Sequence, residues 1–157
     1  MGTKAFILAL LLTLTGCALP PTVSHGCDGP ARDHVMLVDR LRCAGMRAEI
    51  GERVTLPFLR PPGTQLVLSG GGVSGQAELQ SFNYDDTDLG TDGRAVSAAD
   101  AGKFASDGSL RDGSQRIFYR GTPHLFRQDR VLVIYAGDDP AIIAVLTRLI
   151  GKQFAGG

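Results

Sequence analysis

The densest group of chemistry-bearing side chains is a run of aspartates between positions 85 and 92. Calcium prefers several carboxylate and carbonyl oxygens, and the EF-hand loop spaces them over twelve positions. Read from Asp88, the segment has aspartates at positions one and five and a glycine at six. Position three is a glycine, however, and Ala99 stands where a bidentate glutamate is needed. The candidates for a looser calcium site are therefore Asp86, Asp88 and Asp92, and the alternative is a solvated acidic loop.

A glycine-rich segment, residues 70–75, formally matches the G-x-G-x-x-G pattern of dinucleotide-binding loops. In such a site a helix opens on the last glycine, and its N-terminal amides hold the pyrophosphate. Residues 76–84 have some helical propensity but also fit a strand, and no series of alternating strands and helices surrounds them. We therefore expect a hairpin turn here, with a dinucleotide site as the alternative.

The three histidines, His25, His34 and His124, have no motif partners. A hydrolytic site needs a serine or cysteine beside a base that a third group orients. The sequence contains neither a G-x-S-x-G elbow nor an H-E-x-x-H metal motif. His124 is the histidine expected near the sheet, as an ordinary hydrogen-bonded residue. A hydrolase-like enzyme is thus the third of three functional hypotheses, and we predict no catalytic residue and no cofactor.

Two helices are well marked at the ends of the domain. The first is predicted over residues 30–44, capped by Asp28 or Gly29, with apolar residues at helical spacing. The last begins after Asp139, which is a good N-cap, and ends before Gly151. Its broad apolar stripe is suited to cover one face of a sheet.

Alternating or continuous apolar runs predict strands between these helices, with a short helix over residues 93–99. The architecture expected is α+β: one antiparallel sheet of about five strands, with an N-terminal and a C-terminal helix packed on it. Aromatic residues on the predicted strands suit core packing or the lining of a ligand pocket; they are Phe118, Tyr119, Phe126 and Tyr135. The predicted strands are residues 53–59, 65–69, 76–84, 115–119, 124–127 and 131–135.

The N-terminus has the parts of a secretory signal: Lys4, an apolar run over residues 5–14 and then small residues. The run is shorter than the roughly 20 residues of a spanning helix. Leu14-Thr15-Gly16-Cys17 resembles the lipobox of bacterial lipoproteins. The resemblance implies cleavage before Cys17, acylation of that cysteine with palmitate-type chains, and an extracytoplasmic, membrane-anchored protein. By the same resemblance, Ala18 in place of aspartate favours the outer membrane if the organism has two membranes. The alternative is an ordinary signal peptide.

On this resemblance, residues 1–16 are a lipoprotein signal peptide, 17–27 a lipidated stalk and 28–157 one small domain. Assigning Cys17 to lipid leaves Cys27 and Cys43, which lie 16 positions apart in a compartment that permits disulfides. A disulfide between them closes a loop worth about 3 kcal/mol. The alternatives are two free thiols or half of a metal site. An exported chain also lies outside the pool of NAD, which argues against a dinucleotide site at residues 70–75.

Charge limits the partners of this chain. Its 16 basic and 16 acidic residues balance, and no basic block is present, so no nucleic-acid partner is predicted.

The segment 135–140 and the ending 151–156 resemble small secreted bacterial proteins that remain uncharacterised, which implies a fold and no activity. The leading hypothesis is a non-enzymatic module that binds a protein or envelope component. The second is a small-ligand carrier with a pocket between the sheet and the C-terminal helix.

Overall fold

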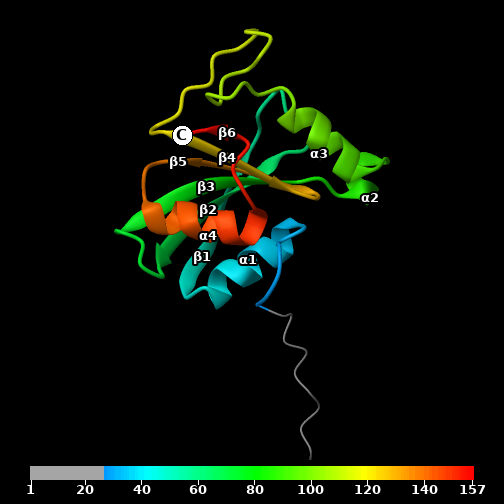
Figure 1. The fold of residues 1–157 in the computed structure, drawn as a ribbon. Coiled ribbons are helices and arrows are strands. Elements are labelled where there is room, and N and C mark those ends of the chain that lie inside the picture. The colour runs from blue at the N-terminus through cyan, green and yellow to red at the C-terminus, as the bar shows by residue number, and fades with distance from the viewer. Residues whose placement is uncertain (1–26) are drawn as a thin grey trace, which may run out of the picture.

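The computed structural model describes residues 27–157, in which six strands form one open antiparallel sheet (Figure 1). Their spatial order is β1-β2-β3-β5-β4-β6, so β1 and the short β6 are the edges. The α+β architecture with N-terminal and C-terminal helices is confirmed. The predicted lipobox with Cys17, and His25, lie outside the described residues. The strands are β1 Met46–Val54, β2 Gly63–Gly70, β3 Gln76–Asn83, β4 Pro123–Gln128, β5 Val131–Ala136 and β6 Ala155–Gly156.

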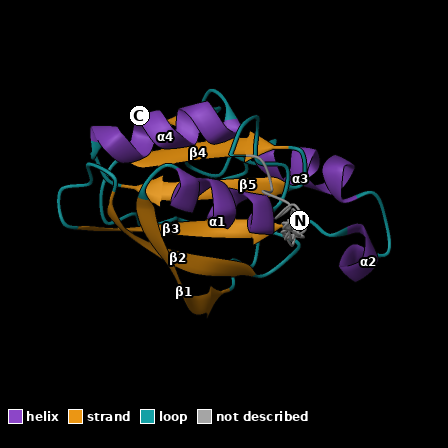
Figure 2. Cartoon of the chain, turned by 90° about the horizontal axis from the view of Figure 1, so that it is seen from below, coloured by secondary structure: helices purple, strands orange, loops and turns teal. Residues whose placement is uncertain are grey.

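Four helices lie around this sheet, and they divide between its two faces. Helices α1, His34–Cys43, and α4, Pro140–Ile150, lie side by side across one face (Figures 1 and 2). Helices α2, Asp86–Leu89, and α3, Gly93–Ala101, lie toward the other face, where α3 contacts β4 and β5. The irregular segment 102–122 continues on that side. No helix within residues 27–157 has the length and apolar character needed to cross a membrane.

Helix α1 begins four residues later than predicted. Its N-cap is Asp33, whose carboxylate accepts a hydrogen bond from the backbone N–H of Met36 at 2.8 Å. The preceding segment stays extended because Ala31 is fully buried and donates its N–H to the carbonyl of Leu149 on α4, at 2.7 Å. The predicted caps Asp28 and Gly29 are therefore wrong: tertiary packing of this segment outweighs its helical pattern.

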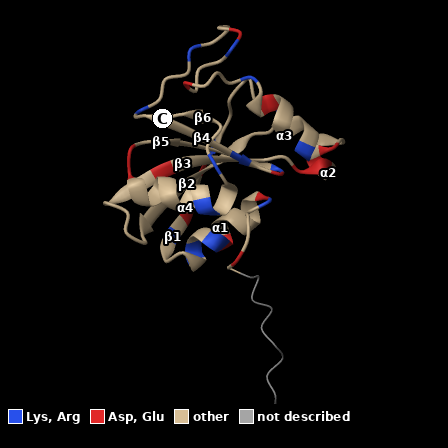
Figure 3. Cartoon of the chain, in the orientation of Figure 1, with Lys and Arg blue, Asp and Glu red and all other residues tan. Residues whose placement is uncertain are grey.

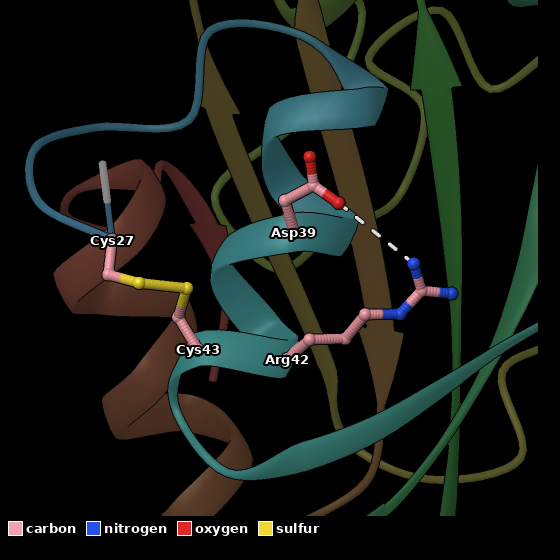
Figure 4. The surroundings of a disulfide bond; sticks show 4 residues. All are labelled: Cys27, Asp39, Arg42 and Cys43. Carbon is pink, nitrogen blue, oxygen red and sulfur yellow. Dashed lines mark ion pairs between the residues drawn. A yellow bond between two sulfur atoms is a disulfide. The ribbon is translucent and has the colours of Figure 1, made fainter. Parts of the chain in front are cut away.

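A disulfide joins Cys27 to Cys43 at the last residue of α1, with 5.6 Å between the Cα atoms (Figure 4). This confirms the predicted pairing. The bridge ties the extended entry segment to the end of the helix that follows it. On the same helix, Arg42 pairs with Asp39 one turn earlier, at 3.9 Å.

Strand β1 starts directly after α1, whereas the sequence pattern predicted a strand over residues 53–59. Gly45, with φ of +83°, allows the chain to reverse from helix into strand. Met46 and Ala48 then alternate into the core. The polar and charged residues that follow on β1 (Figure 3) are exposed because little of the chain covers this end of the sheet, and this masked the pattern of the strand.

The predicted strand over residues 115–119 is also wrong, because these residues form part of an irregular loop. The edge of β4 that a further strand would need is occupied by β6, where Leu125 pairs with Ala155 and His124 with Gly156. By contrast, the continuous apolar run of β5 is a central strand, buried along residues 131–135 between β3 and β4, as its composition predicts. The expected short helix over residues 93–99 is α3.

The core consists of two apolar clusters, one on each face of the sheet. The first packs α1 and α4 against the sheet, including Leu66, Leu79 and Leu146. The second lies under α3 and segment 102–122, including Phe82, Phe104 and Leu132. Strands β1 and β2 contribute few side chains to the second cluster, so this face of the sheet is covered only in part.

Candidate functional site

The partly covered face of the sheet holds a groove of about 570 Å³. Its floor comes from β1, β2, β3 and β5, and one wall comes from residues 117–120 of the irregular loop. The groove therefore lies on the face opposite α1 and α4, beside the part of the sheet that segment 102–122 covers. The residues that line it are Glu52, Val54, Leu56, Gln65, Glu78, Gln80, Ile117, Phe118, Tyr119, Arg120, Ile134 and Ala136.

Strand register places the polar residues of the floor side by side. Gln65 on β2 lies directly opposite Gln80 on β3, and Gln80 lies opposite Ile134 on β5. Directly opposite residues in a sheet point to the same face. On β1 the pairing is irregular between Ile50 and Arg53, and such a bulge redirects the side chains around it. Glu52 lies within this bulge and lines the groove.

The loop wall of the groove has one anchored and one free aromatic side chain. The hydroxyl of Tyr119 donates a hydrogen bond to the carbonyl of Gly108 at 2.9 Å. Burial, with the negative charge of Asp107 nearby, raises the pKa of Tyr119 to about 12, so this donor keeps its proton near neutral pH. The neighbouring Phe118 is 84% exposed. Phe118 therefore adds an exposed aromatic ring to the wall of the groove.

Five polar side chains of the groove have no partners within the described residues. None of Glu52, Gln65, Glu78, Gln80 and Arg120 makes a side-chain hydrogen bond or ion pair within residues 27–157. Together they present carboxylate, amide and guanidinium groups around an apolar strip. This combination of an apolar surface with a few polar groups that can orient a ligand is the usual composition of a binding site.

Other acidic residues have structural roles instead. Asp100 is 3% exposed and accepts hydrogen bonds from the Tyr84 hydroxyl at 3.0 Å and the Arg60 backbone N–H at 2.8 Å. It also pairs with Lys103 at 2.6 Å. Burial and the neighbouring negative charge raise the pKa of Tyr84. The carboxylate of Asp129 pairs with two arginines in a similar way.

The three aspartates of the calcium hypothesis have separate structural roles. Asp86 accepts a hydrogen bond from the Gly93 N–H at 2.7 Å and pairs with Arg130 at 2.8 Å. Asp92 caps α3, and Asp88 lies within α2. Within residues 27–157 no group of three or more His, Cys, Asp or Glu residues is arranged to hold a metal ion. The structure does not bring the three candidates together.

The glycine-rich segment 70–75 forms the hairpin turn that was expected. Strand β3 follows it directly, so no helix N-terminus is present to hold a pyrophosphate and the dinucleotide alternative is wrong. The Ser74 N–H donates to the carboxylate of Asp139 at 2.9 Å, while Asp139 also caps α4 through the Ala141 N–H. A second hollow of about 500 Å³ lies here, between the turn and the start of α4.

Neither of the two histidines within residues 27–157 forms a triad with an acid and a serine in a cleft. His124 is 7% exposed and bonds through Nδ1 to the amide oxygen of Gln153 at 2.8 Å. Its Nε2 atom is buried without a partner. His34 lies within 3.0 Å of the Ser81 hydroxyl, a pairing that no sequence motif indicated. Ser81 is 1% exposed on the α1 side of the sheet, which closes it to a substrate.

The four aromatics singled out from the sequence divide between two roles. Phe118 and Tyr119 line the groove, whereas Phe126 and Tyr135 are buried in the core between the sheet and helices α1 and α4. Side chains of both layers fill most of that space, and the hollow beside the C-terminal helix is the one at its start, lined by Tyr135, Asp139 and Pro140. The groove of about 570 Å³ lies on the opposite face.

Sequence reasoning missed the floor of the groove. The sequence feature that could have indicated the floor is the alternation of polar and apolar residues over 76–80. Such alternation indicates a strand with one uncovered face. Only the strand register shows that this polar side meets Gln65 and the bulge of β1.

Comparison with known proteins adds no assignment to this geometry. No family model matches the chain, and neither a curated protein nor a solved structure matches it.

Proposed function

We propose that the protein is a membrane-tethered, non-enzymatic binding module of the cell envelope, and that the groove on the open face of the sheet is its binding site. The observation that carries this proposal is the set of five unpartnered polar side chains around an apolar strip: Glu52, Gln65, Glu78, Gln80 and Arg120. Polar groups without partners can exchange water for ligand contacts without first breaking an internal bond.

The positions of the remaining reactive groups support binding over catalysis. His124 and Ser81 are buried, and the nearest polar partner of His124 is an amide rather than an acid. The groove itself contains carboxylates and amides but no histidine, serine or cysteine. These residues suit recognition through hydrogen bonds and charge.

Tethering is proposed from the lipobox resemblance at Cys17. Two or three acyl chains hold a protein firmly on a membrane, because each buried methylene contributes roughly 0.8 kcal/mol. Replacement of Cys17 by serine is expected to abolish labelling with a palmitate analogue and to release the protein from the membrane fraction. Equal labelling of the wild-type and variant proteins would contradict lipidation at this residue.

Site-specific photo-crosslinking in cells tests the binding site. Phe118 is exposed in the wall of the groove, so p-benzoylphenylalanine at this position replaces one exposed aromatic ring by another. Val35 provides the matched control, since it is an exposed apolar residue, 67% exposed, on helix α1 of the opposite face.

The expected result is a discrete adduct from position 118, absent from position 35. Combined replacement of Gln65 and Gln80 by alanine in the floor should remove this adduct. Adducts of the same mass from both crosslinker positions, or none from position 118, would contradict binding in the groove.

A further inference from the structure

The charge of the groove restricts what it can bind. Glu52 and Glu78 lie on its floor, and Arg120, in the loop wall, is the cation among its lining residues. The floor carboxylates have no ion-pair partner within residues 27–157, whereas Glu49, earlier on β1, lies 3.9 Å from Arg47. An ionised carboxylate only accepts hydrogen bonds. The floor therefore favours an occupant that bears positive charge and hydrogen-bond donors.

The apolar lining restricts the shape of the charged groups. Val54, Leu56, Ile117 and Ile134 line the same groove as the two carboxylates. A lysine or arginine side chain has an aliphatic stem that packs on apolar surface and a charged end that reaches polar groups. Such side chains fit a site lined by both apolar and acidic residues better than a compact cation does.

The groove opens at an edge of the sheet. Glu52 and Val54 belong to β1, which has a neighbour on one side only within the described residues. On this edge strand the carbonyl of Ala48 already accepts a hydrogen bond from Arg42 at 3.2 Å. The bulge and the charged residues of β1 also disfavour pairing of a further strand with this edge. A ligand that enters here and runs across the strands contacts Glu52 first and reaches Glu78 beyond β2.

The two carboxylates are spaced for an extended ligand. Glu52 and Glu78 lie on β1 and β3, with β2 between them. Since neighbouring strands are about 4.8 Å apart, the backbones that carry the two residues are about 10 Å apart. One ammonium group cannot contact both carboxylates closely when the side chains stand upright from the sheet, but two basic residues of one peptide can.

From these observations we propose that the occupant of the groove is an extended basic peptide segment, in which lysine or arginine residues alternate with aliphatic ones. This inference rests on the proposed function, because it names the partner class of the same groove.

Calorimetry with the purified protein and defined probes tests the inference. The basic probe is the acetylated, amidated peptide Lys-Leu-Lys-Leu-Lys, and the charge-reversed probe is Glu-Leu-Glu-Leu-Glu. A neutral chitin tetrasaccharide represents carbohydrate ligands. We expect the basic peptide alone to bind, with an affinity that weakens as the salt concentration rises to about 0.5 M.

Three variants locate the binding. Glu52→Gln and Glu78→Gln remove the floor charges and keep the side-chain shape, and each should weaken binding of the basic peptide roughly two- to five-fold. Asp39→Asn is the control, because it removes a carboxylate from helix α1 on the opposite face of the sheet. It should change the affinity by less than about two-fold. Glu49 is unsuitable, since it lies opposite Val67 in the same cross-strand row as Glu78 and points to the face of the groove.

Binding of the acidic peptide or the tetrasaccharide in place of the basic peptide would overturn the inference. So would equal effects of the three variants. If the basic peptide fails to bind while the crosslink from Phe118 still forms, the peptide class is wrong and the groove remains the binding site. If both fail, the proposed function fails with it.

Discussion

Replacement of Asp100 by alanine is expected to destabilise the fold strongly. The carboxylate accepts hydrogen bonds from the Tyr84 hydroxyl and the Arg60 N–H, and Tyr84 is fully buried. Each donor left without an acceptor costs about 1–3 kcal/mol when buried. The ion pair with Lys103 adds little because the lysine side chain is 48% exposed. The expected loss in the free energy of unfolding is therefore about 3–4 kcal/mol.

A double-mutant cycle separates this explanation from a general loss of packing. Tyr84→Phe alone should cost about 1 kcal/mol, because it removes a donor and leaves Asp100 with its other partners. In the background of Asp100→Ala the same change removes an orphaned hydroxyl, so it should be neutral or stabilising. Urea unfolding followed by circular dichroism measures all four proteins. Additive effects, or a loss below about 1 kcal/mol for Asp100→Ala, would refute the reasoning.

Three further changes test other parts of the fold. Replacing Cys27 and Cys43 together by serine should lower the free energy of unfolding by about 3 kcal/mol, because the bridge spans 16 positions; an unchanged urea midpoint would contradict this. Burial lowers the pKa of His34 below its ordinary value of 6.5, so protonation disfavours the folded state and stability should fall as the pH drops through about 6.5. His34→Gln should flatten this dependence in urea midpoints measured at about pH 7.5 and 5.5, and an identical slope in both proteins would refute it. Gly93→Ala would place a methyl carbon 1.9 Å from the backbone carbonyl oxygen of Tyr84, so we expect loss of the soluble folded protein; a thermal midpoint equal to that of the wild type would contradict this contact.

The elements that the sequence predicted well are those whose caps and apolar patterns agree with how the elements pack. Helix α4 has an aspartate cap at Asp139, a first-turn Pro140 and a continuous apolar stripe, and its observed bounds follow these signals. Strand β5 is apolar throughout and is central in the sheet. The disulfide between Cys27 and Cys43 followed from the number of cysteines and the expected compartment.

The elements that were misplaced depend on contacts distant in sequence. The edge strand β1 is rich in charge because only Met46 and Ala48 face the core, so its periodicity is weak. The segment 115–119 has strand composition, but β6, formed by Ala155 and Gly156, occupies the edge that it would need. A two-residue strand with small side chains leaves no readable pattern in the sequence.

The candidate site could be predicted only in part. Phe118 and Tyr119 were recognised as residues that could line a pocket, and both do. The pocket was expected under the C-terminal helix, where the core is packed instead. Glu52 and Gln65 carried no motif, because their meeting depends on a bulge and on strand register rather than on spacing along the chain.

A backbone NMR titration of the labelled protein with the Lys-Leu-Lys-Leu-Lys peptide tests the central claim most directly, because it reports binding and its location together. The groove account predicts that amide shifts gather on β1, β2 and β3 around Glu52, Gln65 and Glu78, and on the loop at Phe118. Helices α1 and α4, on the opposite face, should remain unchanged. Shifts confined to those helices, or no shifts with the basic, acidic and carbohydrate probes alike, would contradict it.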